Sequence, residues 1–452
     1  MHSAELHDQP VSIIGGARSG VAVAKLLRSH GAIPFLSDAQ SSEKLRGNIP
    51  ELEHARIAYE LGGHTERVYQ CSLMVISPGV PSTAPVVVEA LKRGITVASE
   101  VETASWYCSS PIIAITGSNG KTTTTTLIGR MMGDARKGHR VAGNIGTAFS
   151  SIVGDLQPGD AAILEISSFQ LDHCSTFKAL ISVLLNITQN HMDRYNNSMQ
   201  QYAESKARIF MNQSGSDVVI YNSDDEWIMQ MIQRARCKTI GFSIRQPLEE
   251  GAFVENGMLV TSFNGKRNEI INTHEISIKG PHNLYNAMAS TLTAQLMGVH
   301  PASIRATLRN FKGVEHRQEF VREVNGVKYY NDSKATSIDA VWYALQAFNQ
   351  PIILMLGGRD KGNDYRRIAQ LVQEHVRAIV ALGESAGKVE EAFSSLKPVK
   401  KASSIDEAVL LAQSLALKGD VVLLSPACAS FDWFENYEQR GRVFKELVKN
   451  LE

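Results

Sequence analysis

The stretch PIIAITGSNGKTT, residues 111–123, decides the fold of the centre of this chain. The apolar run PIIAIT has the composition of a buried strand, and it leads directly into the turn Gly117-Ser118-Asn119-Gly120, followed by Lys121. The general phosphate-loop pattern, G-x-x-x-x-G-K-[ST], has a glycine where this chain has Ile115. Because the G-K-T ending is intact, we interpret the stretch as a shortened phosphate loop between a strand and a helix.

Each residue type in the loop has a chemical use. The glycines allow backbone N–H groups to approach an anion at the start of a helix, which the run TTTTTLIGRMM is predicted to form. Lys121 supplies a cation for the outer phosphates, and Thr122 or Thr123 offers a hydroxyl to Mg²⁺. A plain glycine turn would not need G-K-T at this spacing. The stretch therefore predicts a nucleoside triphosphate site.

The composition narrows the class of protein. The 452 residues suffice for about three domains, and the formal net charge of zero gives no electrostatic reason to expect nucleic acid. The five cysteines form no C-x-x-C pair, which favours reduced thiols over a disulfide framework or a zinc site. The first residues lack a signal-peptide pattern, and no apolar run approaches the roughly 20 residues of a membrane span. We expect a cytoplasmic protein without membrane insertion.

Short apolar runs alternate with helical patterns along the whole chain, which predicts an α/β fold with parallel sheets flanked by helices. The polar residues at the ends of the predicted strands divide the chain into three domains, residues 1–100, 101–313 and 314–452. Gly313 marks the second boundary. Ligands of such sheets gather at the carboxyl ends of the strands, and the polar clusters of this chain stand at those ends.

The first domain opens with a β-α-β unit. The strand VSII precedes the turn Gly15-Gly16-Ala17-Arg18-Ser19-Gly20, and the helix VAVAKLLRSH and the strand IPFLSD, ending at Asp38, come next. A glycine turn at this place suits a diphosphate at a helix N-terminus. The unit also fits an NAD-dependent oxidoreductase, but the strict G-x-G-x-x-G fingerprint fails at Ala17.

The second domain carries three further candidates. Glu165 ends the strand AAILE, so its carboxylate lies beside the phosphate loop if the two strands are neighbours, where it could hold Mg²⁺. His191, in QNHMD, suits a metal ligand, a general base or an oriented donor. Lys206 lies on the predicted helix YAESKARIF, and the residues alone favour an exposed lysine paired with Glu204 or another neighbour.

The third domain has polar clusters after three predicted strands. Asp332-Ser333-Lys334 and Thr336 come after the first, and Lys361 lies in GGRDKG after the second. Ser430 lies in SPACASFDWF after the third, near a predicted helix start, with Tyr437 further along. Cations and helix N-termini of this kind suit carboxylates.

Taken together, these motifs resemble the Mur ligases, the ATP-dependent amino-acid ligases of peptidoglycan synthesis. The resemblance runs almost from end to end. It rests on TGSNGKT, the Glu165 strand, NITQNHMDRY, YAESKARIF, GPHNLYNAMAS, EHRQEF, NDSKAT, GGRDKG and SPACASFDWFENYEQRGRVF. It implies an N-terminal Rossmann-like UDP-binding domain, a central phosphate-loop ATPase domain and a C-terminal Rossmann-like domain that binds the amino acid.

The resemblance also implies site residues. Thr122, Glu165, His191 and Lys206 would hold two Mg²⁺ ions, with Lys206 carbamylated, and Lys121 would act with the last three in catalysis. The ATP ligands would be Gly117, Ser118, Asn119, Gly120, Lys121, Thr122, Thr123, Asn283, Asn286, Arg317, Asp332 and Lys334. D-Glutamate would contact Thr336, Lys361, Ser430 and Tyr437, the last at a position where phenylalanine is common. The UDP-linked substrate would contact Ala17, Arg18, Asp38, Ser77, Gly79, Asn144, Ser167 and Gln170.

GGRDKG and SPACASFDWF most resemble the members that join D-glutamate to UDP-N-acetylmuramoyl-L-alanine through an acyl phosphate. We therefore expect these two molecules and ATP as substrates, no nucleic-acid partner, and a monomer. A sister Mur ligase or a ligase like folylpolyglutamate synthase remains the alternative. An NAD-dependent oxidoreductase is a more distant one, because it leaves GSNGKT unexplained.

Lys121→Ala tests the phosphate loop. Removing the ammonium group should abolish ATP-dependent phosphate release, because nothing else in the loop neutralises the outer phosphates. A phosphate-release assay measures the loss, and an unchanged circular dichroism spectrum controls for folding. Turnover at the wild-type rate would contradict the interpretation.

Overall fold

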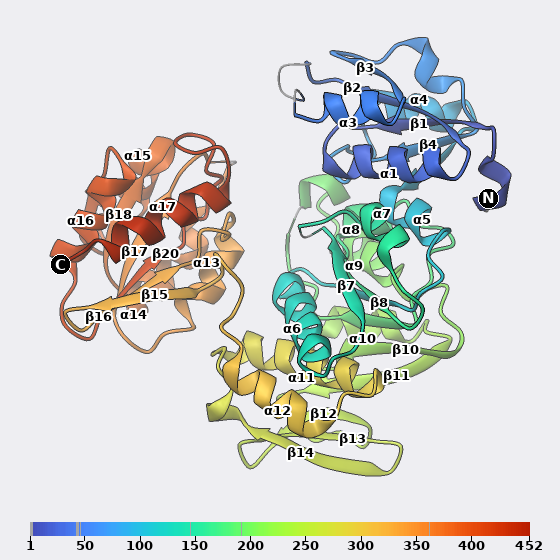
Figure 1. Cartoon of the computed structure of the whole chain (residues 1–452). Coiled ribbons are helices and arrows are strands. Elements are labelled where there is room, and N and C mark those ends of the chain that lie inside the picture. The colour runs from blue at the N-terminus through green and yellow to red at the C-terminus, as the bar shows by residue number, and fades with distance from the viewer. Residues whose placement is uncertain (1–2, 42–44, 46, 145, 191, 361) are drawn as a thin grey trace. The chain divides into compact units, whose positions relative to one another are not determined.

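The computed structural model describes residues 3–41, 45, 47–144, 146–190, 192–360 and 362–452, and it contains three β-sheets with their own helices (Figure 1). Packing divides the chain into two compact units. One comprises the chain up to Glu275 together with Tyr285–Arg309, and the other comprises Ile276–Leu284 and Asn310–Glu452. The first unit holds the first two sheets and the second unit holds the third.

The N-terminal sheet has five parallel strands in the order β3-β2-β1-β4-β5. Strand order reverses between β1 and β4, and the carboxyl ends of strands at such a switch point form a ligand crevice. Helix α1 lies along the sheet in Figure 1 and also packs on α5 and α7. The elements are β1 (Pro10–Ile14), α1 (Arg18–Ser29), β2 (Ile33–Asp38), α3 (Ile49–His54), β3 (Ala58–Leu61), β4 (Leu73–Ile76), α4 (Pro85–Lys92) and β5 (Thr96–Ser99).

The central sheet has nine strands in the order β14-β13-β12-β11-β10-β9-β6-β8-β7, parallel except for the β12-β13-β14 meander. Strands β6, β8 and β9 are buried along their whole length, because helices cover both faces of a parallel sheet. The strands are β6 (Ile112–Thr116), β7 (His139–Gly143), β8 (Ala161–Glu165), β9 (Ile181–Leu184), β10 (Gly215–Asn222), β11 (Cys237–Ser243), β12 (Gly251–Glu255), β13 (Met258–Phe263) and β14 (Lys266–Asn272). The helices are α5 (Glu100–Ser105), α6 (Lys121–Asp134), α7 (Phe149–Ile152), α8 (Ser168–Leu171), α9 (Met199–Ala207), α10 (Glu226–Ile232), α11 (Pro281–Leu296) and α12 (Pro301–Asn310).

The C-terminal sheet has six strands in the order β15-β16-β20-β17-β18-β19, with β15 antiparallel to the rest. Helices α16 and α17 pack side by side on it (Figure 1). The elements are β15 (Glu319–Val324), β16 (Val327–Asn331), α13 (Ile338–Leu345), β17 (Ile352–Gly357), α14 (Ala369–His375), β18 (Val376–Leu382), α15 (Ala386–Phe393), β19 (Val399–Lys401), α16 (Ile405–Leu415), β20 (Val421–Leu424) and α17 (Tyr437–Lys449).

The predicted α/β class and the predicted strands are confirmed, including the threonine-rich helix α6 after the glycine loop. One local expectation is wrong: the helix expected near Ser430 begins only at Tyr437. Asn436 caps that helix with its side chain, which accepts a hydrogen bond from the Gln439 N–H. The domain boundaries at residues 100 and 313 stay predictions. No helix in the described part of the chain combines the length and the apolar run that a bilayer crossing requires.

Candidate active site

The phosphate loop connects β6 to α6 through backbone that only glycine adopts easily. Gly120 is the N-cap of α6 with φ of +82°. A Cβ atom at this position would lie 2.3 Å from Oδ1 of Asn286, whose side chain is buried beside the loop and also accepts a hydrogen bond from Thr124 Oγ1 at 3.2 Å. Asn286 therefore occupies the space that a side chain at position 120 would need.

Asn186, at the end of the neighbouring strand β9, holds the loop in place. Its carbonyl accepts from the Ser118 N–H at 2.9 Å, and its Oδ1 accepts from the Asn119 N–H at 2.8 Å. Its Nδ2 donates to the Asn119 carbonyl at 3.1 Å. The N–H groups of Ser118 and Asn119 are thus used inside the fold, and they fix the loop at the point where α6 begins. Sequence reasoning missed Asn186, although it lies within the predicted strand ISVLLNIT.

Glu165 lies beside the loop, as the strand order requires. Strand β8 pairs with β6 in parallel, with Glu165 opposite Ile115. The carboxylate is 2% exposed, and its Oε1 accepts from Asn144 Nδ2 at 3.0 Å. Thr122, also buried, lies in the first turn of α6. A carboxylate and a hydroxyl on neighbouring elements are hard oxygen donors, and this donor set fits Mg²⁺.

The residues alone predicted that Lys206 is exposed, and this prediction is wrong. Lys206 is 1% exposed, because α9 turns this face inward against α8 and α10. Its Nζ donates to the Gly117 carbonyl at 3.0 Å, and Lys121 Nζ donates to the same carbonyl at 2.9 Å. Burial, and then the charge of Lys121, lower the pKa of the Lys206 amine well below its usual range. His191, the third candidate of this domain, lies outside the described residues.

A cavity of about 500 Å³ lies at the carboxyl ends of the N-terminal strands, and Gly143, Asn144, Gly146 and Ala148 also line it. Arg18, at the start of α1, donates to the Gly146 carbonyl across it. Six of the eight residues predicted to contact the UDP-linked substrate line this cavity: Ala17, Arg18, Asp38, Ser77, Gly79 and Asn144. The other two, Ser167 and Gln170, form a capping box at the start of α8 and do not line it.

Close packing shapes the glycine turn of this cavity. A Cβ atom at Gly20 would lie 1.8 Å from the Gly15 carbonyl oxygen, so α1 can begin this near β1 only with glycine there. Asp38 accepts from the Gly16 N–H at 2.5 Å and from the Gln40 N–H at 2.7 Å. Its carboxylate thus organises the turn from the end of β2.

The three polar clusters of the C-terminal unit meet because β20 lies between β16 and β17. The GGRDKG and SPACAS segments pair directly, since the Arg359 N–H donates to the Ala429 carbonyl at 2.9 Å. Asp332 is buried and accepts from Ser425 Oγ at 2.8 Å and from the Gln318 N–H at 3.2 Å. Burial raises the pKa of Asp332 to about 7, although Ser425 and Arg317 oppose the rise.

Arg440, which sequence reasoning passed over within EQRGRVF, joins two of these clusters. Its guanidinium is 2% exposed and donates to the Ser333 carbonyl at 2.7 Å and to the Cys428 carbonyl at 3.2 Å. Burial lowers the pKa of Arg440 to about 10, which leaves it charged at neutral pH. A buried cation bonded to neutral acceptors makes this edge of the sheet favourable for an anion.

The structure also describes Lys334, Tyr437, Ser430, Thr336 and Asn283 among the predicted residues. Lys334 Nζ lies 5.4 Å from the centre of the Tyr437 ring, so the ring of Tyr437 packs against a cation. Ser430 is buried, whereas Thr336 is exposed. Asn283 donates from Nδ2 to the Lys279 carbonyl at 2.9 Å in the first turn of α11. Lys361 lies outside the described residues.

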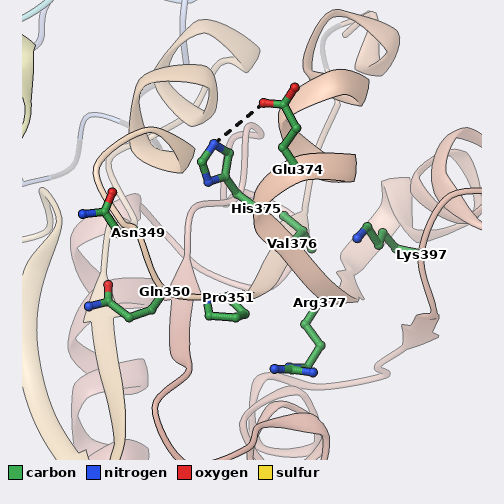
Figure 2. A pocket seen from close by; sticks show the side chains of 8 residues that line it. All are labelled: Asn349, Gln350, Pro351, Glu374, His375, Val376, Arg377 and Lys397. Atoms are coloured by element: carbon green, nitrogen blue, oxygen red, sulfur yellow. Dashed lines mark ion pairs between the residues drawn. The ribbon is translucent and has the colours of Figure 1, made fainter.

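The C-terminal sheet also has a hollow at its opposite edge. Figure 2 shows its lining residues, which lie just before β17, at the junction of α14 and β18, and, in the case of Lys397, before β19. The hollow has a volume of about 400 Å³. It lies at the amino ends of the strands, away from the polar clusters, so we do not assign it to the candidate site.

Fold and site define the class of protein: a three-domain α/β ligase with a phosphate loop in its central domain. The chain belongs to the Mur ligase family. It matches the family descriptions "Mur ligase MurD-like, N-terminal domain" over residues 9–99, "Mur ligase middle domain" over 115–294 and "Mur ligase, glutamate ligase domain" over 316–428.

Relatives cover the whole chain. It is 46% identical to the UDP-N-acetylmuramoylalanine–D-glutamate ligase of Chloroherpeton thalassium and 44% identical to that of Salinibacter ruber, with 99% of each chain covered in both comparisons. Among solved structures, MurF from Acinetobacter baumannii superimposes with a TM-score of 0.62 at 15% identity, covering 96% of this chain and 93% of that one. UDP-N-acetylmuramate-alanine ligase MurC from Thermotoga maritima does so with a TM-score of 0.59 at 19% identity, covering 98% and 99%. These two structures share the fold.

Gly120→Ala tests the packing of the phosphate loop. The added methyl group would overlap Asn286 and force φ of +82° on alanine. We therefore expect the free energy of unfolding to fall by about 1–3 kcal/mol and the affinity for ATP to decrease. Denaturant unfolding and calorimetric titration with ATP measure both. Gly133→Ala is the matched control in the same helix, where only ordinary contacts exist, and it should be neutral or stabilising by up to roughly 1 kcal/mol. Equal behaviour of the two variants would contradict the assignment.

Proposed function

We propose that this chain is an ATP-dependent ligase that joins D-glutamate to UDP-N-acetylmuramoyl-L-alanine in the synthesis of peptidoglycan precursors. The observation that carries the proposal is 44–46% identity across 99% of both chains to enzymes named for this reaction. The phosphate loop, the N-terminal cavity and the C-terminal clusters support it, because one part of the chain suits each substrate. We further propose a cytoplasmic monomer.

The phosphate loop is the proposed site of ATP. Lys121 and the first turn of α6 would neutralise the triphosphate, and Thr122 and Glu165 would hold Mg²⁺, whose chemistry is to offset charge on the phosphoryl oxygens. Asn286, which lies beside the loop, and Asn283, one turn earlier on the same helix, would also contact ATP. Arg317, Asp332 and Lys334 are the proposed nucleotide ligands of the C-terminal unit.

A second Mg²⁺ would be held by His191 and a carbamylated Lys206. The low pKa of Lys206 supports this modification, because only a neutral amine attacks carbon dioxide. The neutral amine forms an N–C bond to carbon dioxide and loses one proton, which leaves an anionic oxygen donor at the buried end of the side chain. A buried anion at Lys206 would also pair with the ammonium group of Lys121, which contacts the same carbonyl.

The proposed reaction has two steps. The alanyl carboxylate attacks the γ-phosphorus of ATP, the bond to the bridging oxygen breaks, and ADP leaves an acyl phosphate behind. The amine of D-glutamate then attacks the acyl carbon, the bond to phosphate breaks, and the amine loses a proton. Each step brings anions together, so this chain's cations govern both.

D-Glutamate is the proposed ligand of the C-terminal clusters. Thr336, Lys361, Ser430 and Tyr437 would contact it, and the buried charge of Arg440 supports an acidic amino acid at this edge. The muramoyl-alanine end of the other substrate would reach from the N-terminal cavity toward Asn144, Ser167 and Gln170, close to Glu165.

A phosphate-release assay tests the function. With ATP, Mg²⁺ and UDP-N-acetylmuramoyl-L-alanine, we expect phosphate release with D-glutamate and background rates with L-glutamate, L-alanine or meso-diaminopimelate. Mass spectrometry should detect the amide product. Release with another of these amino acids would favour a sister ligase, and a melting temperature raised by NAD instead of ATP would favour an oxidoreductase.

Carbamylation has its own test. Protein equilibrated with ¹³C-bicarbonate should give a carbamate carbon signal that is absent from Lys206→Arg, because a guanidinium group does not react with carbon dioxide. We also expect Lys206→Arg to lose most activity. Lys25→Arg is the control, since Lys25 is half exposed and paired with Glu51. A signal that persists in Lys206→Arg would contradict the proposal.

A further inference from the structure

A hydrogen-bond relay to which the proposed reaction assigns no role ends at His64 in the N-terminal cavity. Ser37, at the carboxyl end of β2, is fully buried, and its Oγ lies 2.7 Å from Glu60 Oε1 and 2.7 Å from His64 Nδ1. Glu60 also accepts from the Thr65 N–H at 3.0 Å and from Thr65 Oγ1 at 2.7 Å. His64 lines the cavity together with Asp38 and Gln40.

The relay fixes which nitrogen of His64 carries the proton. Burial alone would raise the pKa of Glu60, but hydrogen bonds from Thr65 and Ser37 lower it, so Glu60 is ionised and only accepts. The single hydroxyl proton of Ser37 is therefore donated to Glu60. The short contact between Ser37 and His64 then requires Nδ1–H of the ring as donor. In the neutral ring, Nε2 is left as an acceptor for a ligand in the cavity.

The strand order of the N-terminal sheet indicates which part of a bound nucleotide lies nearest to His64. In a sheet of this order the diphosphate of a nucleotide lies at the β1–α1 turn, and its nucleoside extends over the end of β2. Strand β3 is the neighbour of β2 on the far side from β1, and His64 comes after β3 in the chain. The base of a bound nucleotide is thus the part nearest to His64.

We propose that His64 recognises the uracil of the nucleotide-sugar substrate by accepting a hydrogen bond from N3–H at Nε2. This inference rests on the proposed function, because it assumes a uridine nucleotide in the cavity. Uracil presents a donor at N3, whereas cytosine presents a lone pair there. An Nε2 acceptor held by Ser37 and Glu60 therefore attracts the first base and repels the second.

UDP and CDP are matched probes, since they differ only at the base edge. Calorimetric titration of the full chain should give UDP an affinity roughly ten- to a hundredfold above that of CDP. In His64→Phe, which keeps a ring without nitrogens, UDP binding should fall to the level of CDP while CDP binding changes little. Steady-state assays should then show a raised KM for the UDP-linked substrate with kcat retained.

Two further variants separate recognition from a structural role of His64. Ser37→Ala keeps the imidazole but removes the group that fixes its proton, so the preference for UDP should fall toward that of His64→Phe. Glu60→Gln keeps an acceptor oxygen toward Ser37, since its amide can donate to Thr65, and should retain the wild-type preference. Melting curves of all variants control for folding.

The outcomes distinguish a failure of uracil recognition by His64 from a failure of the proposed function. If the wild type binds UDP but His64→Phe and Ser37→Ala keep the preference, or lose both nucleotides equally, recognition by His64 is wrong and the proposed function stands. A wild type that binds UDP and CDP equally also overturns the inference alone. A wild type that binds neither nucleotide overturns both.

Discussion

The candidate active site depends on the hydrogen bonds between Asn186 and the phosphate loop. They attach Ser118 and Asn119 to the end of β9, which is itself paired with β6. With the loop held in this way, the Gly117 carbonyl accepts from both Lys121 and Lys206. Gly120 completes the arrangement, since only a residue without Cβ leaves room for Asn286.

Buried charge is the second constraint. Lys206 and Arg440 are basic groups taken out of water and hydrogen-bonded to neutral carbonyls, and burial lowers the pKa of each. Such arrangements cost free energy in the absence of an anion, and that cost becomes binding energy when phosphate or carboxylate groups arrive. A ligase that must bring together a triphosphate, a carboxylate and a dicarboxylate needs this arrangement of charge.

The same topological rule positions each group of candidate residues. The N-terminal cavity, the phosphate loop with Glu165, and the C-terminal clusters all stand at the carboxyl ends of parallel strands. The N-terminal relay of Ser37, Glu60 and His64 obeys this rule too, because it joins the ends of β2 and β3. Within each sheet, strand order decides which of these ends become neighbours.

The sequence by itself determined the α/β class, the strand–loop–helix around Lys121 and the polar residues after each strand, because periodicity and glycine placement are local properties. Only the tertiary structure decided that Lys206 is buried, since YAESKARIF does not reveal which helix face the neighbouring α8 and α10 cover. It alone brought Asn186 to Asn119, Arg440 to Ser333 and His64 to Ser37. These contacts join residues far apart in the chain, and their partners depend on strand order, which no local pattern encodes.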